Sequence, residues 1–104
     1  MAAIRKSVYM YTIQSNTSPS TPGGNADVNC YDARGNMVGI LHFDENGFGN
    51  GSGGMLNPNQ QIEMFLHFRS LESVLHILET RKPVELVFDP SQNNMAYIIT
   101  QKLH

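Results

Sequence analysis

The chain has 104 residues, 40% of them hydrophobic, a formal net charge of −2 and one cysteine, and these values predict one folded domain without an internal disulfide. Lysine and arginine form no cluster larger than the pairs Arg5–Lys6 and Arg81–Lys82, which excludes the electrostatic footprint of a protein that binds duplex nucleic acid. No apolar run approaches the roughly 18 residues of a membrane span, and the N-terminus lacks the apolar region of a signal peptide, so a soluble, cytoplasmic protein without a membrane partner is expected.

The first 43 residues predict a strand, a loop and a β-hairpin. Residues 4–14 are rich in β-branched and aromatic types and are expected to form one strand, whereas residues 15–25 are rich in Ser, Asn, Pro and Gly and are expected to form a loop. Residues 26–31 alternate apolar Ala26, Val28 and Cys30 with polar residues, which indicates a half-buried strand. A turn at residues 32–36 and a returning strand at residues 37–43 complete the hairpin.

A glycine-rich stretch follows this hairpin. Residues 44–47, Asp-Glu-Asn-Gly, predict a turn rather than a calcium loop, because the positions that should supply further oxygen ligands do not. Residues 48–59 are expected to be a glycine-rich connection without regular structure. Ordering so much glycine costs conformational entropy, so this loop is predicted to be mobile without ligand and to lie beside a binding site, with Phe48 as an apolar cap. A tolerated connection without function is the alternative.

The second half predicts a strand, a helix and two further strands. Residues 61–68 alternate, and their polar face is expected to expose Glu63 and His67. The period then changes to that of an amphipathic helix, with Ser70 as its N-cap and Pro83 beyond its end. Residues 84–88 and 95–102 predict the last strands, with a turn at residues 89–94 between them. The apolar stripe of the helix is Leu71, Val74, Leu75 and Leu78.

The expected fold is therefore α+β, an antiparallel sheet of about six strands with one amphipathic helix in the order β-β-β-β-α-β-β within one domain, residues 1–104. One helix covers a strip only about 10 Å wide. The apolar positions in residues 4–14 and 95–102 then need a second layer, most simply another copy of the chain, so a homo-oligomer is expected.

The string at residues 49–54 matches the glycine pattern of dinucleotide-binding loops. That mechanism needs a helix N-terminus directly after the loop, whereas Pro58 and a predicted strand follow here. No cofactor is therefore expected. A weaker role remains, in which the bare backbone N–H groups of Gly49, Gly51 and Gly53 close over an anion or a polar ligand.

Three polar residues at even spacing suggest an acid–base site. Glu63, His67 and Arg69 lie on one strand or at its end and are expected to face the same way, which would suit a small ribonuclease-like enzyme with Glu63 as base, His67 as acid and Arg69 on a phosphate. An ordinary solvated strand face has the same pattern. No metal is expected, because the four histidines lack short ligand spacing, although His42 and Asp44 share a strand face. Cys30 is expected to be buried and inert.

Tyrosine offers a rigid apolar face with a polar tip, which favours binding surfaces. Tyr31 has the opposite parity to Val28 and Cys30, so it is expected to be exposed or to lie under a second layer. The terminal pair Leu103–His104 is set aside, because it resembles the edge of a purification tag. The residues expected to bind a ligand are Tyr31, Phe48, Gly49, Gly51, Gly53, His67 and Arg69.

The stretches 29–32 (Asn-Cys-Tyr-Asp), 76–86 (His-Ile-Leu-Glu-Thr-Arg-Lys-Pro-Val-Glu-Leu) and 96–100 (Ala-Tyr-Ile-Ile-Thr) resemble a family of small bacterial and phage-type proteins of unassigned function. The resemblance covers roughly residues 26–100 and implies one compact α+β domain. Its motifs are structural and bring no catalytic residue. Members of that family continue into an acidic tail after the last strand, which this chain lacks.

Low charge, surface tyrosines and the glycine-rich stretch favour a non-enzymatic, oligomeric binding module for a small ligand. Phage proteins that sequester nucleotide immune signals are one functional class with this profile. The comparison rests on these general features and not on a shared sequence motif. A protein–protein interaction module or inhibitor, using a sheet edge or an aromatic face, is the first alternative. The ribonuclease-like enzyme is the second.

Overall fold

The structure is a computed structural model that describes residues 2–18, 21–44, 53–80 and 83–100. It is α+β, and in this part of the chain eight strands form one sheet with a single α-helix. In chain order the elements are β1 (Ile4–Val8), β2 (Met10–Ser18), β3 (Thr21–Tyr31), β4 (Met37–Asp44), β5 (Gly53–Leu56), β6 (Ile62–His67), the 3₁₀ helix η1 (Phe68–Ser70), α1 (Leu71–Thr80), β7 (Val84–Asp89), the 3₁₀ helix η2 (Pro90–Gln92) and β8 (Met95–Thr100).

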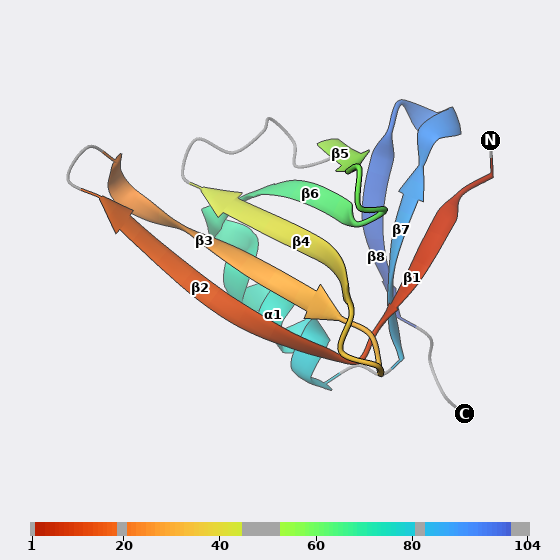
Figure 1. The fold of residues 1–104 in the computed structure, drawn as a ribbon. Coiled ribbons are helices and arrows are strands. Elements are labelled where there is room, and N and C mark those ends of the chain that lie inside the picture. The colour runs from red at the N-terminus through yellow and green to blue at the C-terminus, as the bar shows by residue number, and fades with distance from the viewer. Residues whose placement is uncertain (1, 19–20, 45–52, 81–82, 101–104) are drawn as a thin grey trace.

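The two edge strands of the sheet are neighbours in sequence. The strand order is β1-β7-β8-β5-β6-β4-β3-β2, yet β1 and β2 are separated by Tyr9 alone. The backbone N–H of Tyr9 donates to the carbonyl oxygen of Tyr31 at 2.7 Å. Figure 1 shows β1 and β2 meeting at one end of the molecule and diverging toward the other. The sheet therefore curls into a partly closed barrel.

The N-terminal region contains more strand than its composition predicts. The single strand expected at residues 4–14 is wrong, because Tyr9 divides it into β1, which pairs with β7, and β2, which pairs with β3. The loop expected at residues 15–25 is also wrong, because β2 continues to Ser18 and β3 begins at Thr21. The hairpin ladder supplies backbone partners to these residues, and pairing overrides their weak strand propensity. The second hairpin, β3–β4, is confirmed.

The sheet is mixed rather than antiparallel. β4 and β6 are parallel, because the chain between them adds β5, which pairs antiparallel with the far edge of β6. Residues 53–56 were expected to be loop because of their glycines. In the structure a side chain at Gly54 would overlap the Cβ of Ala96, so glycine is what allows β5 to approach β8. Of the expected loop at residues 48–59, residues 48–52 lie outside the described residues, as do residues 45–47 of the expected turn.

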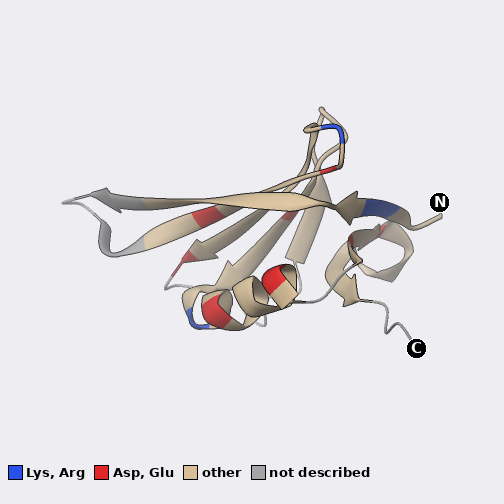
Figure 2. Ribbon diagram, turned by 90° about the horizontal axis from the view of Figure 1, so that it is seen from below, with Lys and Arg blue, Asp and Glu red and all other residues tan. Residues whose placement is uncertain are grey.

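The helix packs on the inner face of the curled sheet, and Figure 2 shows it lying along one side of the strands. α1 begins at Leu71, directly after Ser70, which is the last residue of η1. Cys30 is fully buried, as expected, and this burial raises the pKa of its thiol to about 12. The buried core comprises Val28, Cys30, Val38, Leu41, Phe43, Ile62, Met64, Val74, Leu78, Val84, Leu86, Phe88 and Ala96.

The C-terminal elements follow the sequence closely. β7 and β8 form an antiparallel pair, and the expected turn at residues 89–94 contains η2. β8 is described as far as Thr100, so the end of the strand expected at residues 95–102 lies outside the described residues. Among the residues that the structure describes, no helix has the length and apolar character to cross a membrane.

Candidate functional site

A line of side chains crosses the outer face of the sheet, the face that turns away from α1. Register places these residues directly opposite one another on neighbouring strands, so they point to the same side. Their strand neighbours, such as Leu41 and Met64, point inward and are buried. We call this line the His42 row. It consists of Asp27 (β3), His42 (β4), Phe65 (β6), Gly53 (β5) and Met95 (β8).

His42 lies between two carboxylates. Its Nδ1 is 2.8 Å from Oδ1 of Asp27, and its Nε2 is 2.7 Å from Oε1 of Glu63. A neutral imidazole carries one N–H, so both hydrogen bonds are donated only by the imidazolium form. All three side chains are at most one-third exposed. Both ring nitrogens of His42 are therefore occupied by carboxylate oxygens.

Glu63 is fixed by a second partner. Nδ2 of the buried Asn57 donates to Oε2 of Glu63 at 2.9 Å and to Oε1 of Gln61 at 2.8 Å. The Oδ1 of Asn57 accepts the backbone N–H groups of Asn59 and Gln61, which closes the turn between β5 and β6. The hydrogen bonds from His42 and then Asn57 hold the pKa of Glu63 below its usual range, against desolvation. Glu63 is therefore a positioned anion.

Phe65 stacks on the fixed imidazole. The two rings lie 5.1 Å apart between centroids, with an interplanar angle of 13°. Because two carboxylates hold His42, the imidazole forms a rigid support on one side of the Phe65 ring. The network of His42 therefore orients an aromatic side chain on the outer face of the sheet.

Gly53 follows Phe65 in the row and places no side chain between Phe65 and Met95, and we call this position the slot. Gly53 is exposed, and a Cβ added there would have no heavy atom of the described residues within 4 Å. Its neighbours in the row, Phe65 and Met95, belong to strands two spacings apart, roughly 9.6 Å. A flat ring between two side chains needs two contacts of roughly 3.5–4.0 Å. The strand spacing thus matches the room that one planar group needs.

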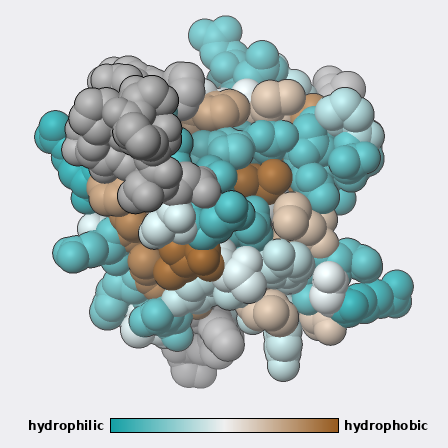
Figure 3. Space-filling view, turned by 60° about the vertical axis from the view of Figure 1, so that its left-hand side comes forward, coloured by the Kyte–Doolittle hydropathy of each residue, from teal (hydrophilic) through white to brown (hydrophobic). Residues whose placement is uncertain are grey.

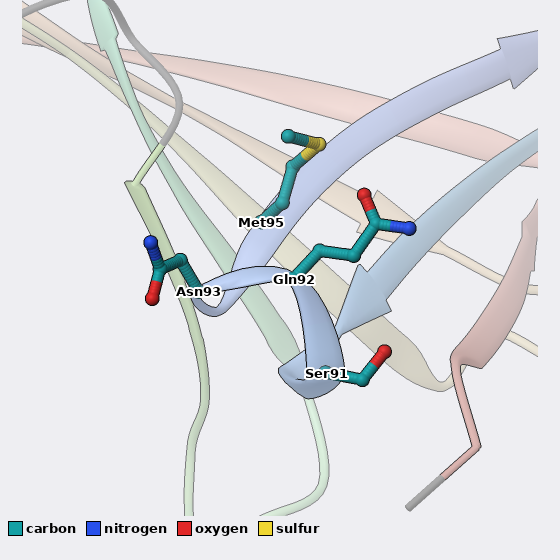
Figure 4. Close-up of a pocket in the computed structure, with 4 residues that line it drawn as sticks. All are labelled: Ser91, Gln92, Asn93 and Met95. Atoms are coloured by element: carbon teal, nitrogen blue, oxygen red, sulfur yellow. The ribbon is translucent and has the colours of Figure 1, made fainter.

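A polar pocket adjoins the slot at Met95. Its volume is about 520 Å³, and it is lined by Ser91, Gln92, Asn93 and Met95, as Figure 4 shows. Asn93 adopts a left-handed conformation, with φ of 57°, at the end of η2. The pocket presents a hydroxyl and two amides, which can both donate and accept hydrogen bonds.

The structure places the expected ligand residues in different regions. Gly53 lies in the slot, and His67 follows Phe65 on the same face of β6. The Nδ1 of His67 accepts the backbone N–H of Arg69 at 3.0 Å and lies 3.4 Å from Nε of Arg69. Arg69 is exposed and forms no salt bridge with the other described residues. Phe48, Gly49 and Gly51 lie outside the described residues.

Tyr31 does not join this site. It ends β3 opposite Met10, near the junction of β1 and β2, and its hydroxyl is 3.4 Å from Oγ1 of Thr12. The expectation that Glu63 is exposed is also wrong, because it is half-buried against His42 and Asn57. Four residues of strand, roughly 13 Å, separate Glu63 from His67, so the two do not converge on one reacting group.

The main residues that the sequence did not single out are Asp27, Phe65, Asn57 and Met95. Alternation puts Asp27 and His42 on the same face of the predicted hairpin, but the register shift between Cys30 and Tyr31 that brings them opposite each other is not evident from the sequence. Phe65 and Met95 could not be found, because their relation to Gly53 depends on the strand order. Within the described ranges no group of His, Cys, Asp and Glu side chains has an arrangement that could hold a metal ion. No family model, curated protein or solved structure significantly matches the chain.

Proposed function

We propose that this protein is a non-enzymatic binding protein for a small ligand with a planar ring, such as the base of a nucleotide. The ring would enter the slot over Gly53 and lie between Phe65 and Met95. The observation that carries the proposal is that, among the described residues, no atom fills the space at Gly53 beside an aromatic ring that a fixed histidine already orients. A side chain in place of Gly53 would occupy the ligand's position.

The side chains around the slot supply suitable attraction. Stacking of a base on an aromatic side chain contributes about 1–3 kcal/mol, and a methionine sulfur near an aromatic ring adds about 0.3–1.5 kcal/mol. Because Phe65 is oriented before the ligand arrives, little side-chain freedom is lost on binding. These contributions correspond to a ligand of modest affinity unless its polar groups also bind.

The polar groups at the two ends of the slot determine how a nucleotide would lie. β6 and β8 run in the same direction across β5, so Gln92 and Asn93 lie at the Glu63 end and Arg69 lies beyond the opposite end. The carboxylates of Asp27 and Glu63 disfavour a phosphate at the Glu63 end. A base edge would therefore meet the amides, and the phosphate would point toward Arg69, which suits a bidentate contact.

This arrangement is compatible with sequestration of a nucleotide signal, the class suggested by the composition. It gives less support to a ribonuclease-like reaction, because Glu63 binds His42 and Asn57 rather than facing a substrate together with His67. The protein-interaction alternative rests on a different surface, the edge of β2.

A titration by calorimetry with adenosine and guanosine nucleotides, the matching nucleosides and inorganic phosphate tests the proposal. We expect nucleotides to bind more tightly than nucleosides and phosphate alone to bind weakest. Gly53→Leu should weaken nucleotide binding by about tenfold or more, since it removes a contact of about 1.4 kcal/mol or more. Ser7→Leu, an exposed position on the distant strand β1, is the control. Equal affinity in wild type and Gly53→Leu, or no binding of any nucleotide, would overturn the proposal.

A further inference from the structure

The two edge strands of the sheet, β1 and β2, differ in how well their sequences prevent pairing with a strand of another chain. Edge strands present backbone N–H and C=O groups, and natural proteins guard them with charged residues, especially lysine, or with proline. β1 carries Arg5 and Lys6 within five residues. β2 is nine residues long and its sequence, Met-Tyr-Thr-Ile-Gln-Ser-Asn-Thr-Ser, contains no charged residue, no proline and no glycine. In Figures 1 and 2 no other described element lies along the outer side of β2.

Large apolar side chains gather at the same edge. Tyr9, Met10 and Ile13 are 63%, 48% and 47% exposed and are the three most exposed large apolar residues in the described part of the chain. Met10 lies opposite Tyr31 and so belongs to the outer face, whereas Ile13 lies opposite the buried Val28 and belongs to the inner face. Figure 3 shows apolar patches, in brown, among hydrophilic residues on the face turned toward the viewer. Apolar groups thus flank the β2 edge on both faces.

We propose that a second copy of this chain pairs with this edge, antiparallel, so that two β2 strands join two sheets about a twofold axis. An antiparallel strand pair is self-complementary, as an isologous dimer interface requires. Full overlap of the nine residues places Gln14 on the axis. The dimer is independent of the proposed ligand slot, because β3, β4 and β6 lie between β2 and Gly53.

The size of the contact predicts its strength. Nine residues of strand extend roughly 30 Å, and a sheet with its side chains is roughly 10 Å thick, so each copy contributes roughly 300 Å². Both copies together reach roughly 600 Å², less than the roughly 1,200 Å² at which stable interfaces begin, which is the size of a weak, transient contact. The β2 dimer should therefore be concentration-dependent rather than permanent. A surface pocket of about 300 Å³ lined by Tyr9, Met10, Tyr11, Leu78 and Glu79 opens beside this edge and can accept side chains of the second copy.

Sedimentation velocity over a range of concentrations, with a charge-exchange pair at the axis, tests the proposal. Wild type should approach twice the 11.6 kDa of one chain as its concentration rises. Gln14→Lys alone and Gln14→Glu alone each place like charges opposite each other, and each should weaken the dimer by about tenfold or more. A mixture of the two variants should dimerise again, because opposite charges then meet. A variant that had simply misfolded would not be rescued in this way.

Ser7→Lys is the matched control, since it adds the same charge to the guarded edge strand β1 and should leave the dimer unchanged. The proposal is overturned if wild type remains monomeric at its highest soluble concentration. It is also overturned if Ser7→Lys dissociates the dimer as strongly as Gln14→Lys, or if mixing the two Gln14 variants does not restore it.

Discussion

The ring of Phe65 lies nearly parallel to the imidazole of His42, with centroids 5.1 Å apart and an interplanar angle of 13°. Asp27 and Glu63 each bind one nitrogen of that imidazole. The two carboxylates therefore fix the histidine ring, and the histidine ring in turn orients Phe65, which borders the slot at Gly53. In this account the charged cluster positions the binding surface and does not itself contact the planar ring of the ligand.

Removal of the imidazole should weaken both the fold and the slot. His42→Ala leaves Asp27 and Glu63 without their shared donor, and hydrogen bonds to charged groups contribute about 1.5–3 kcal/mol each. We expect a loss of about 2 kcal/mol in the free energy of unfolding in urea, and weaker nucleotide binding in the folded protein. His76→Ala, at an exposed position of α1, is the control. Unchanged stability and binding in His42→Ala would contradict the positioning role.

The pH dependence of stability should include a contribution from Glu63. Its pKa in the folded protein is lowered, first by the hydrogen bond from His42 and then by that from Asn57. The ionised carboxylate thus favours the folded state, and this stabilisation is complete above the pKa of an unfolded glutamate and is lost as the pH falls through the lowered pKa. Wild type should therefore lose more stability on acidification than Glu63→Gln. Parallel urea-unfolding curves for the two proteins at each pH would disprove this.

Close packing leaves no room for a side chain at Gly39 or Gly54, whereas Gly53 has room for one. A Cβ at Gly39 would overlap Cδ1 of Leu86 and lie 2.8 Å from the carbonyl oxygen of Ile62, and one at Gly54 would overlap Cβ of Ala96. Overpacking of this kind costs about 1–3 kcal/mol, so Gly39→Ala and Gly54→Ala should each lower the melting temperature. Gly53→Ala enters open space and should not lower it below wild type by more than the experimental error. Equal melting temperatures for all three variants would refute the packing of β4 and β5.

Tyr11 links the β2 strand to the end of the helix. Its hydroxyl donates to Oε1 of Glu79 at 2.5 Å, and this hydrogen bond is the main reason that the pKa of Tyr11 is raised to about 12. In a spectrophotometric titration of wild type, one tyrosine should ionise later than the others. In Glu79→Gln that late ionisation should move toward 10, because the carboxylate no longer favours the protonated phenol. If the two titration curves coincide, α1 does not contact β2 at Tyr11.

The local elements were largely predictable, because side-chain periodicity encodes them. Alternation located β3, β4, β6 and β7, and the apolar stripe from Leu71 to Leu78 located the helix. The long-range arrangement was not predictable. Glycine at 53 and 54 indicates a loop by local rules, and only the presence of Ala96 on a strand from the far end of the chain shows why β5 needs it.

In the candidate site, too, individual residues could be selected from the sequence, whereas their arrangement in space could not. Gly53, His67 and Arg69 were selected from the sequence, and the structure places Gly53 and His67 beside Phe65. The Asp27–His42 pair depends on the register shift in the β3–β4 hairpin, and the contact of His42 with Glu63 depends on β6 lying parallel to β4. That parallel pairing cannot be derived from strands read one at a time, because β5 reverses the chain between them.

The most direct test of the central claim is a ¹H–¹⁵N nuclear magnetic resonance titration of the labelled protein with a mononucleotide. We expect the largest shift changes at the backbone amides of Gly53, Phe65 and Met95, with smaller changes at Asn93 and Arg69 and none along β1. Binding that shifts none of Gly53, Phe65 and Met95, or the absence of any nucleotide-dependent shift, would contradict the assignment of this slot as the ligand site.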